Sequence, residues 1–275
     1  MSKILELDRL RDTIDLEVHG KENIPSDYPC VIISNHNRLL DIFYLPLAFD
    51  KDIISLVSAR LVYKQNVDRL SQINKYLNAF PIEAHGGSEY ADMGIRNSSL
   101  FLNEGLDVSI FPEGAYIDDT EHVFKGRTGG ARVLFDTLDS KSFAYFLPVS
   151  IDVRSKSELD SYAVSSDDKV IITINDPINP ETYYREYSKT RDMHERNEVL
   201  HQITDEGMKT IAASLGREYV DEYIELNPKG NVIFSNGDTV ETNEAQKVKY
   251  IRRYEKGLKT LRMALINDIN CVPKN

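Results

Sequence analysis

The sequence predicts an α/β protein with a mostly parallel sheet and helices on both of its faces. Short apolar runs alternate along the chain with stretches of helical periodicity. The runs have the length of buried strands, and the helical stretches between them are long enough to connect parallel neighbours. Hydrophobic residues make up 41% of the 275 residues and charged residues 28%, which is typical of a globular protein with a sizeable core.

Each apolar run is bounded by polar or turn-forming residues, as expected of a strand. The candidate strands are Val31–Ile33, Ile53–Val57, Ala79–Ile82, Val108–Phe111, Phe146–Ile151 and Lys169–Ile174. The candidate helices between them are Leu39–Phe49, Asp68–Leu77, Tyr90–Asn103 and Gly130–Leu138. Pro148 inside one run indicates an edge strand or an irregularity near a pocket. In sheets of this kind the active site lies in the loops at the carboxyl ends of the strands.

The chain is expected to divide near residue 215. Residues 1–215 form the α/β domain, and residues 216–275 form a mainly helical extension packed on or beside it. A polar helical pattern runs from Thr190 to Leu226, and Val232–Phe234 is a short strand candidate. A final helix is expected over Glu244–Asn270, because apolar side chains recur there at spacings of three and four.

The charge of the chain is unevenly distributed. The net charge is −11, which disfavours nucleic acid as a partner because a duplex binder needs a basic face. Residues 247–262 nevertheless hold seven basic side chains and one acidic side chain. This segment is either a solvated helix face or a surface for an acidic partner or an anionic membrane.

The sequence shows no feature of a secreted or membrane-spanning protein. The first ten residues are too charged for a signal peptide, and no window approaches the roughly 20 apolar residues of a membrane span. We therefore expect a cytoplasmic protein, either free or in peripheral contact with a membrane. Neither of the two cysteines, Cys30 and Cys271, belongs to a C-x-x-C pair, so no zinc or thiol redox motif is visible. Cys30 is expected to be a small buried residue.

The first polar motif, Ser34-Asn35-His36-Asn37-Arg38-Leu39-Leu40-Asp41, directly follows a predicted buried strand. Residues five apart do not meet on a regular helix, because each residue turns about 100°. His36 and Asp41 can meet if His36 lies in the loop and Asp41 in the first turns of the helix. A carboxylate would then fix the tautomer of an imidazole that acts as a general base. The alternative is that His36 caps the helix and Asp41 is a first-turn acid favoured by the helix dipole.

The second polar motif also follows a strand and contains a carboxylate beside a glycine. Pro112-Glu113-Gly114 ends the run Val108–Phe111 sharply, and Gly114 would let a backbone approach a ligand closely. Glu113 could accept hydrogen bonds from a substrate hydroxyl or amine. The following segment, Lys125-Gly126-Arg127-Thr128-Gly129-Gly130, enters a helix whose first N–H groups suit an anion. Alternatively, this is an ordinary turn with solvated charges.

Taken together, these segments resemble the glycerolipid acyltransferases typified by 1-acylglycerol-3-phosphate acyltransferase. The resemblance runs from about Leu16 to Ile178. It is carried by Asn35-His36 with Asp41, by Phe111-Pro112-Glu113-Gly114, by Phe124-Lys125-Gly126 and by Leu147-Pro148-Val149. Val18-His19-Gly20, Asn23-Ile24-Pro25 and Asn175-Asp176-Pro177-Ile178 look like the lead-in and the strand exit of the family.

The resemblance implies a fold and a mechanism. His36 would deprotonate the acceptor and Asp41 would hold the imidazole, while the acceptor attacks the thioester of an acyl carrier protein or coenzyme A. Substrate contacts would come from the flanking residues of the motifs: Asn35, Arg38, Glu113, Gly114, Lys125, Gly126 and Arg127. No metal, no cofactor beyond the thioester co-substrate and no covalent enzyme intermediate is implied.

The departures from the family pattern concern the acceptor. Ala84 stands where the family has an arginine that holds the acceptor phosphate, and Ala115-Tyr116 replaces the usual Thr-Arg after Glu113-Gly114. Arg38 replaces a frequent serine. Neutral side chains cannot replace bidentate phosphate contacts, so we expect an acceptor without a phosphomonoester, such as an amino or hydroxy metabolite. The alternatives are a lysophosphatidic acid acyltransferase with a rearranged phosphate site, a non-catalytic acyl-binding protein, and a thioesterase.

Overall fold

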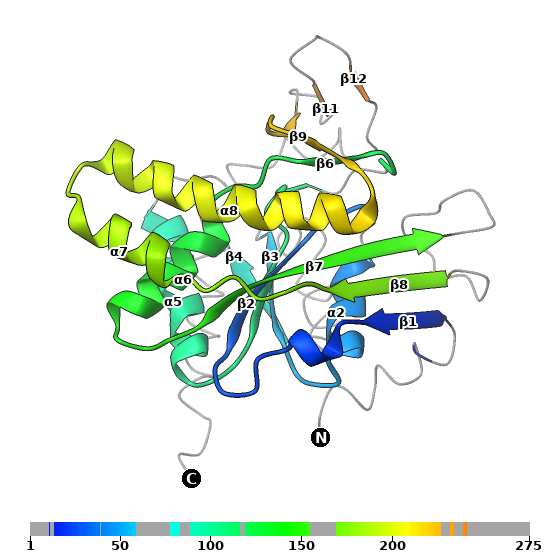
Figure 1. Cartoon of the computed structure of the whole chain (residues 1–275), viewed down its shortest axis with the longest axis horizontal. Helices are drawn as coiled ribbons and strands as arrows, with labels where there is room; N and C mark the ends of the chain where they lie inside the picture. Colours follow the sequence, from blue (N-terminus) through cyan, green and yellow to red (C-terminus); the bar gives the residue numbers. More distant parts are fainter. Residues whose placement is uncertain are drawn as a thin grey trace.

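The computed structural model describes residues 11, 14–38, 40–58, 78–82, 89–115, 119–154 and 169–226, and short strands at 232–233 and 239–240. Figure 1 shows one main sheet with helices packed against it. The sheet strands are β1 (Asp15–His19), β2 (Cys30–Ser34), β3 (Ile54–Ser58), β4 (Asn78–Ile82), β5 (Val108–Ile110), β7 (Tyr145–Arg154) and β8 (Lys169–Ile174). The helices are η1 (Lys21–Asn23), α2 (Asp41–Phe49), α5 (Glu89–Asn103), α6 (Gly129–Asp139), α7 (Glu181–Lys189) and α8 (Met193–Leu215).

The strands of the main sheet follow the order β1-β8-β7-β2-β5-β3-β4. Within the described sheet, only the β7–β8 pairing is antiparallel, and the other five pairings are parallel. The predicted mostly parallel α/β sheet is therefore confirmed. The polar motifs follow β2 and β5, which are neighbours at the centre of this sheet.

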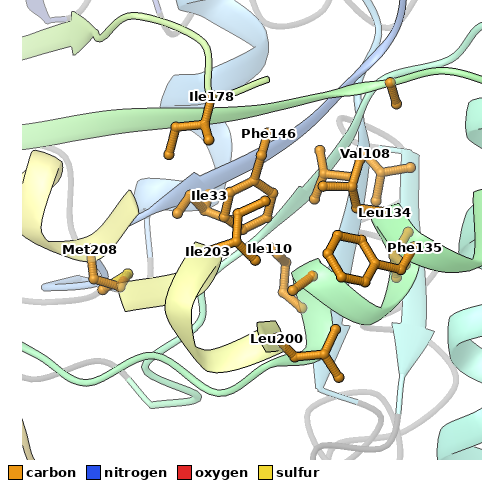
Figure 2. Packing of buried hydrophobic residues seen from close by; sticks show 14 of the residues in the cluster. Ile33, Val108, Ile110, Leu134, Phe135, Phe146, Ile178, Leu200, Ile203 and Met208 are labelled. Atoms are coloured by element: carbon orange, nitrogen blue, oxygen red, sulfur yellow. The ribbon is translucent and has the colours of Figure 1, made fainter. Parts of the chain in front are cut away.

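Strand β2 explains why the sheet needs a layer of helices on each face. All five of its residues are buried, so both faces of the strand must be covered. Ile32 packs with the buried side chains of α2, whereas Val31 and Ile33 pack with those of α6 and α8. Figure 2 shows Ile33 in this second layer, beside Phe146 and Ile203. Alternate residues of a strand point to opposite faces, which produces this division.

The proline in β7 does not mark an edge strand. Pro148 lies between β2 and the β8 side of the sheet, opposite Ile33. Its carbonyl oxygen accepts the backbone N–H of Asn175, which follows the end of β8, at 3.0 Å. In an extended strand the nitrogen and the carbonyl of one residue face the same neighbouring strand. The nitrogen of Pro148, which has no hydrogen to donate, therefore faces Asn175, one residue beyond the end of β8. The edge interpretation was therefore wrong, and an irregularity near a pocket stays a prediction.

Most predicted elements are present with bounds shifted by a few residues. The predicted helix over Thr190–Leu226 is wrong at its C-terminal end, since α8 stops at Leu215 and Gly216 takes a left-handed φ of 65°. The structure also contains β1 and α7, which the sequence analysis did not assign as elements. The helices expected at Asp68–Leu77 and Glu244–Asn270 lie outside the described residues.

Two small sheets lie apart from the main one. β6 (His122–Phe124) pairs in parallel with β9 (Glu218–Val220), and β10 (Glu225–Leu226), β11 (Val232–Ile233) and β12 (Thr239–Val240) form a three-stranded sheet. The strand expected near Val232 is thus present. The domain boundary at residue 215 stays a prediction, although β9 beyond it is hydrogen-bonded to β6. Over the part of the chain that the structure describes, no helix is both long and apolar enough to cross a bilayer.

Candidate active site

The carboxyl ends of three adjacent strands, β7, β2 and β5, bring the two polar motifs together. His36 lies two residues beyond β2, and Glu113 lies three residues beyond β5. The Glu113 Oε2 atom accepts the backbone N–H of His36 at 2.8 Å, which joins the motifs directly. The sheet order therefore places both motifs in one site, at the edge where α/β proteins bind their ligands.

His36 and Asp41 meet as the loop-and-helix interpretation predicted. Helix α2 begins at Asp41, so His36 remains in the loop and its Nδ1 lies 3.1 Å from Asp41 Oδ2. The Asp41 side chain is fully buried, whereas 14% of the His36 side chain is exposed. The pair is thus closed to solvent on the carboxylate side and accessible on the imidazole side.

The carboxylate of Asp41 fixes both the loop and the imidazole. Its Oδ2 atom also accepts the backbone N–H groups of Asn37 and Arg38, each at 2.8 Å. When Asp41 is ionised its carboxylate only accepts hydrogen bonds, so the contact favours a neutral His36 with its proton on Nδ1 and with Nε2 unprotonated. Such an imidazole can take a proton from a hydroxyl or an amine. Of the helix-terminus alternative, only the part about Asp41 holds, because Asp41 is the acid in the first turn of α2. The part about His36 was wrong, because the N-cap residue is Leu40 and no side chain caps the helix.

A ring stack holds the imidazole from the β5 side. The rings of His36 and Phe111 lie 4.1 Å apart between centroids at an interplanar angle of 19°. Rotation of the imidazole about its side-chain bonds would break this stack as well as the bond to Asp41. The motifs alone predict no contact between His36 and Phe111, because only the sheet order reveals that the two loops are neighbours.

Asn35 ties the His36 loop to β7. Its Oδ1 atom accepts the backbone N–H of Ile151 and its Nδ2 atom donates to the Ile151 carbonyl, both at 2.9 Å. The second hydrogen of Nδ2 goes to Asn37 Oδ1 at 2.8 Å. Asn35 and Arg38 are 1% and 4% exposed. In this structure Asn35 braces the loop, and contact of either residue with a substrate stays a prediction.

Glu113 is buried and uses both carboxylate oxygens to hold backbone. Oε2 accepts the N–H of His36, and Oε1 accepts the N–H of Phe124 in β6 at 3.0 Å. Burial raises the pKa of Glu113 to about 7, partly opposed by these two hydrogen bonds. The carboxylate thus braces His36 from the second motif, and its expected contact with an acceptor stays a prediction.

The basic segment after the second motif lies against residues beyond α8. Lys125 Nζ lies 2.6 Å from Asp221 Oδ1 and 3.9 Å from Asp205 Oδ2. Lys125 and Arg127 both approach the ring of Tyr223, at 5.7 and 5.5 Å from its centroid. Much of the charge of Lys125 is therefore compensated within the protein, and Tyr223 comes from the segment after α8, to which the motifs assign no role.

Glycine is needed at positions 114 and 126 for two different local reasons. Gly114 has a left-handed φ of 76°, and a Cβ there would lie 3.1 Å from Arg127 Nε, so the Arg127 side chain passes over this glycine. Gly126 is buried, and a Cβ there would lie 2.8 Å from the Thr204 side chain of α8. Gly126 thus allows close packing on α8, whereas Gly114 keeps the turn open beside Arg127.

Arg217 is a site residue that sequence reasoning missed. It follows α8, only 7% of its side chain is exposed, and its Nη1 atom donates to Asn37 Oδ1 at 2.8 Å. It lies 180 positions along the chain from Asn37, and no local pattern signals such a contact. Ala84 and Tyr116, the two departures at the phosphate positions, lie outside the described residues. Two grooves of about 580 and 550 Å³ are lined by other residues than those of this site.

A family model described as acyltransferase matches residues 15–152, half of the chain. The chain belongs to the acyltransferase family. The matched range begins at β1, includes both polar motifs and ends within β7, so the resemblance that the motifs carried is confirmed. Among solved structures, this acyltransferase is similar to the 1-acyl-sn-glycerophosphate (LPA) acyltransferase PlsC of Thermotoga maritima, with 19% identity and a TM-score of 0.47. That match covers 76% of this chain and 80% of PlsC.

Proposed function

We propose that this acyltransferase moves a fatty acyl group from an acyl carrier protein or coenzyme A thioester to a hydroxyl or amine, with His36 as the general base. The observation that supports this proposal is the buried carboxylate of Asp41 at 3.1 Å from Nδ1 of a partly exposed imidazole. Three further contacts hold His36: the stack on Phe111, the backbone bond to Glu113, and the loop bonds to Asp41.

In the proposed reaction the proton moves twice. Nε2 of His36 takes the proton of the acceptor hydroxyl or amine as the acceptor atom attacks the thioester carbonyl carbon. The tetrahedral intermediate collapses, its carbon–sulfur bond breaks, and the imidazolium returns the proton to the leaving thiolate. Asp41 stabilises the imidazolium between the two transfers without accepting its proton. The products are an ester or amide and a free thiol.

For the acceptor we propose a compound without a phosphomonoester. Ala84 and Tyr116 occupy the positions where the resemblance leads us to expect phosphate-binding arginines. Lys125, the nearest lysine to the second motif, is paired with Asp221 and has Asp205 close by. A dianionic phosphate would have to compete with these carboxylates for the ammonium group.

A second candidate, lysophosphatidic acid as the acceptor, is favoured by Arg127. Its side chain passes over Gly114, and its guanidinium is a suitable bidentate partner for a phosphate. In this proposal Arg127 replaces the arginine that is absent at Tyr116, and the enzyme acts in phospholipid synthesis. The two candidates differ in one measurable property, the use of lysophosphatidate.

A competition assay distinguishes the candidates. The enzyme receives one acyl group, as a carrier-protein thioester or a coenzyme A thioester, with a mixture of lysophosphatidate, amino acids and amino alcohols, and mass spectrometry identifies the products. We expect acylated amino or hydroxy compounds and poor use of lysophosphatidate. Efficient acylation of lysophosphatidate, with a Michaelis constant in the micromolar range, would support the second candidate. Acceptor-independent release of fatty acid that exceeds all transfer would indicate a thioesterase.

A further inference from the structure

Arg217 connects four segments that are far apart in the sequence. Besides its bond to Asn37, Nη1 donates to the backbone carbonyl of Asp119 at 3.2 Å. Its Nη2 atom lies 3.3 Å from Asp152 Oδ1 at the end of β7. The guanidinium therefore contacts three segments, which are the His36 loop, the loop that precedes β6, and strand β7. The backbone of Arg217 belongs to a fourth segment, the one after α8.

The contact with Asn37 leads directly to the proposed dyad. Asn37 Oδ1 accepts from both Arg217 and Asn35, and Asn37 Nδ2 donates to the Asp119 carbonyl at 2.6 Å. The backbone N–H of the same Asn37 donates to Asp41 Oδ2, the atom that His36 Nδ1 contacts. A displacement of Asn37 would thus disturb the loop that places His36 on Asp41.

The backbone of Arg217 is fixed at both ends. Its N–H donates to the Ala212 carbonyl at 2.9 Å, in the turn that Gly216 makes after α8. The next N–H, of Glu218, donates to the Glu121 carbonyl and opens the β9–β6 pairing. The side chain therefore leaves a rigid corner, so little backbone entropy remains to be lost when it binds the loop, and its planar guanidinium loses less side-chain entropy for each hydrogen bond formed.

The positive charge of Arg217 is compensated within the protein. Asp152, 25% exposed, supplies the opposite charge, and the positive charge of Arg217 also lowers the pKa of the nearby Glu113 against the effect of burial. With 7% of its side chain exposed, Arg217 has little surface to offer a substrate. Its contacts are those of a residue that acts through its neighbours.

We propose that Arg217 is a positioning residue for acyl transfer: it holds Asn37, and through Asn37 the loop in which His36 meets Asp41. This inference rests on the proposed role of His36 as general base. It assigns a part in the reaction to a residue outside the matched family range and outside the predicted catalytic domain.

The kinetic test compares Arg217→Ala with Arg154→Ala. Arg154 is a matched control, because it pairs with the other carboxylate oxygen of the same Asp152 at 2.9 Å while 69% of its side chain is exposed. We expect Arg217→Ala to lower kcat about ten-fold or more, with both Michaelis constants within about two-fold of wild type. Arg154→Ala should leave kcat unchanged. Wild-type kcat in Arg217→Ala, or a raised Michaelis constant with unchanged kcat, would overturn the proposal.

A conservative variant covers the case in which Arg217→Ala does not fold. A lysine reaches either Asn37 or Asp152 with its single ammonium but cannot bridge both, so Arg217→Lys should have a kcat between wild type and Arg217→Ala. If Arg217→Ala is unfolded, a folded Arg217→Lys with a kcat about three-fold or more below wild type supports the positioning role. A folded Arg217→Lys with wild-type kcat contradicts it.

A spectroscopic readout separates this proposal from the proposed function. In ¹⁵N spectra of the neutral imidazole, wild-type protein should show His36 protonated at Nδ1 and unprotonated at Nε2. Arg217→Lys should show a mixture of the two tautomers, whereas Arg154→Ala should match wild type. Identical His36 spectra in wild type and Arg217→Lys would overturn the positioning role. The other tautomer in wild type would instead count against His36 as the base.

Discussion

Two histidine–aspartate pairs in the described part of the chain have different surroundings. His36 and Asp41 lie 3.1 Å apart, and His122 and Asp119 lie 2.9 Å apart. The carboxylate of Asp41 is fully buried, whereas the side chains of Asp119 and His122 are 20% and 34% exposed. Distance alone therefore does not identify a catalytic pair.

The difference lies in what each carboxylate holds. Asp119 Oδ1 accepts the backbone N–H groups of Glu121 and His122, so it closes its own turn before β6. Asp41 also closes a turn, but the loop that it holds is braced in addition by Asn35, Glu113 and a ring stack on Phe111. Convergence of independent supports on one imidazole marks His36 as the proposed base.

The largest expected effect comes from His36→Ala. Loss of a general base lowers the rate roughly a hundred-fold to ten-thousand-fold. Steady-state kinetics with one acyl thioester and its acceptor measure the loss, and thermal unfolding checks that the variant remains folded. If turnover stays at the wild-type level, the two pairs are functionally equivalent and the proposed mechanism is wrong.

The next largest effect is expected for Asp41→Asn. An asparagine amide can turn its N–H₂ group toward His36, which would stabilise the tautomer with the proton on Nε2 and leave no free base there. We expect kcat to fall about a hundred-fold or more, with small changes in the Michaelis constants. A rate near wild type would show that the contact at 3.1 Å is structural, like that of the second pair.

Glu113, which accepts the backbone N–H of His36, should make the stability of the protein depend on pH. Its pKa in the folded state is about 7, above its usual value of 4.5. Between these two pH values Glu113 is protonated in the folded state and ionised in the unfolded state. The stability that Glu113 contributes is therefore complete below about pH 4.5 and declines as pH rises toward 7. Denaturant unfolding should show that wild type loses roughly 1–3 kcal/mol relative to Glu113→Gln between pH 5 and 7.5. A pH-independent difference between the two proteins would contradict this pKa.

The smallest effect is expected for His122→Ala, which serves as the counterpart of His36→Ala. Asp119 retains the backbone N–H of Glu121, and its carbonyl still accepts from Asn37 and Arg217, so the turn should persist. We expect kcat within about two-fold of wild type and a free energy of unfolding within about 1 kcal/mol. A hundred-fold loss of kcat would place the second pair in the reaction as well.

The sequence predicts the first pair well because its determinants are local. A buried strand, a short loop and a helix, predicted from Leu39 and observed from Asp41, lie between residues 30 and 49, and the required loop-and-helix geometry follows from the five-residue spacing. The central strands are equally well predicted, because their apolar runs are short and sharply bounded. The end of α8 was missed because the polar pattern continues beyond Gly216, where a left-handed residue ends the helix.

The remaining supports of the site depend on the order of strands in the sheet. Phe111 meets His36, and Glu113 meets the His36 backbone, only because β2 and β5 are neighbours. Arg217 reaches Asn37 only because α8 crosses the sheet and turns at Gly216. These contacts span from 75 to 180 residues of chain, and periodicity within a window of 11 to 18 residues carries no information about them.

The pairing of β1 with β8 has a consequence for biosynthesis. Asp15 pairs with Lys169, so the first described strand of the sheet can be completed only after 154 further residues have been made. Contacts of such high sequence separation form late, and N-terminal segments emerge from the ribosome first. The nascent chain must therefore carry an unpaired β1 strand until the residues of β8 have been made. Arg217 emerges later still, so a ribosome-bound chain cannot complete the His36 loop until translation has passed the end of α8.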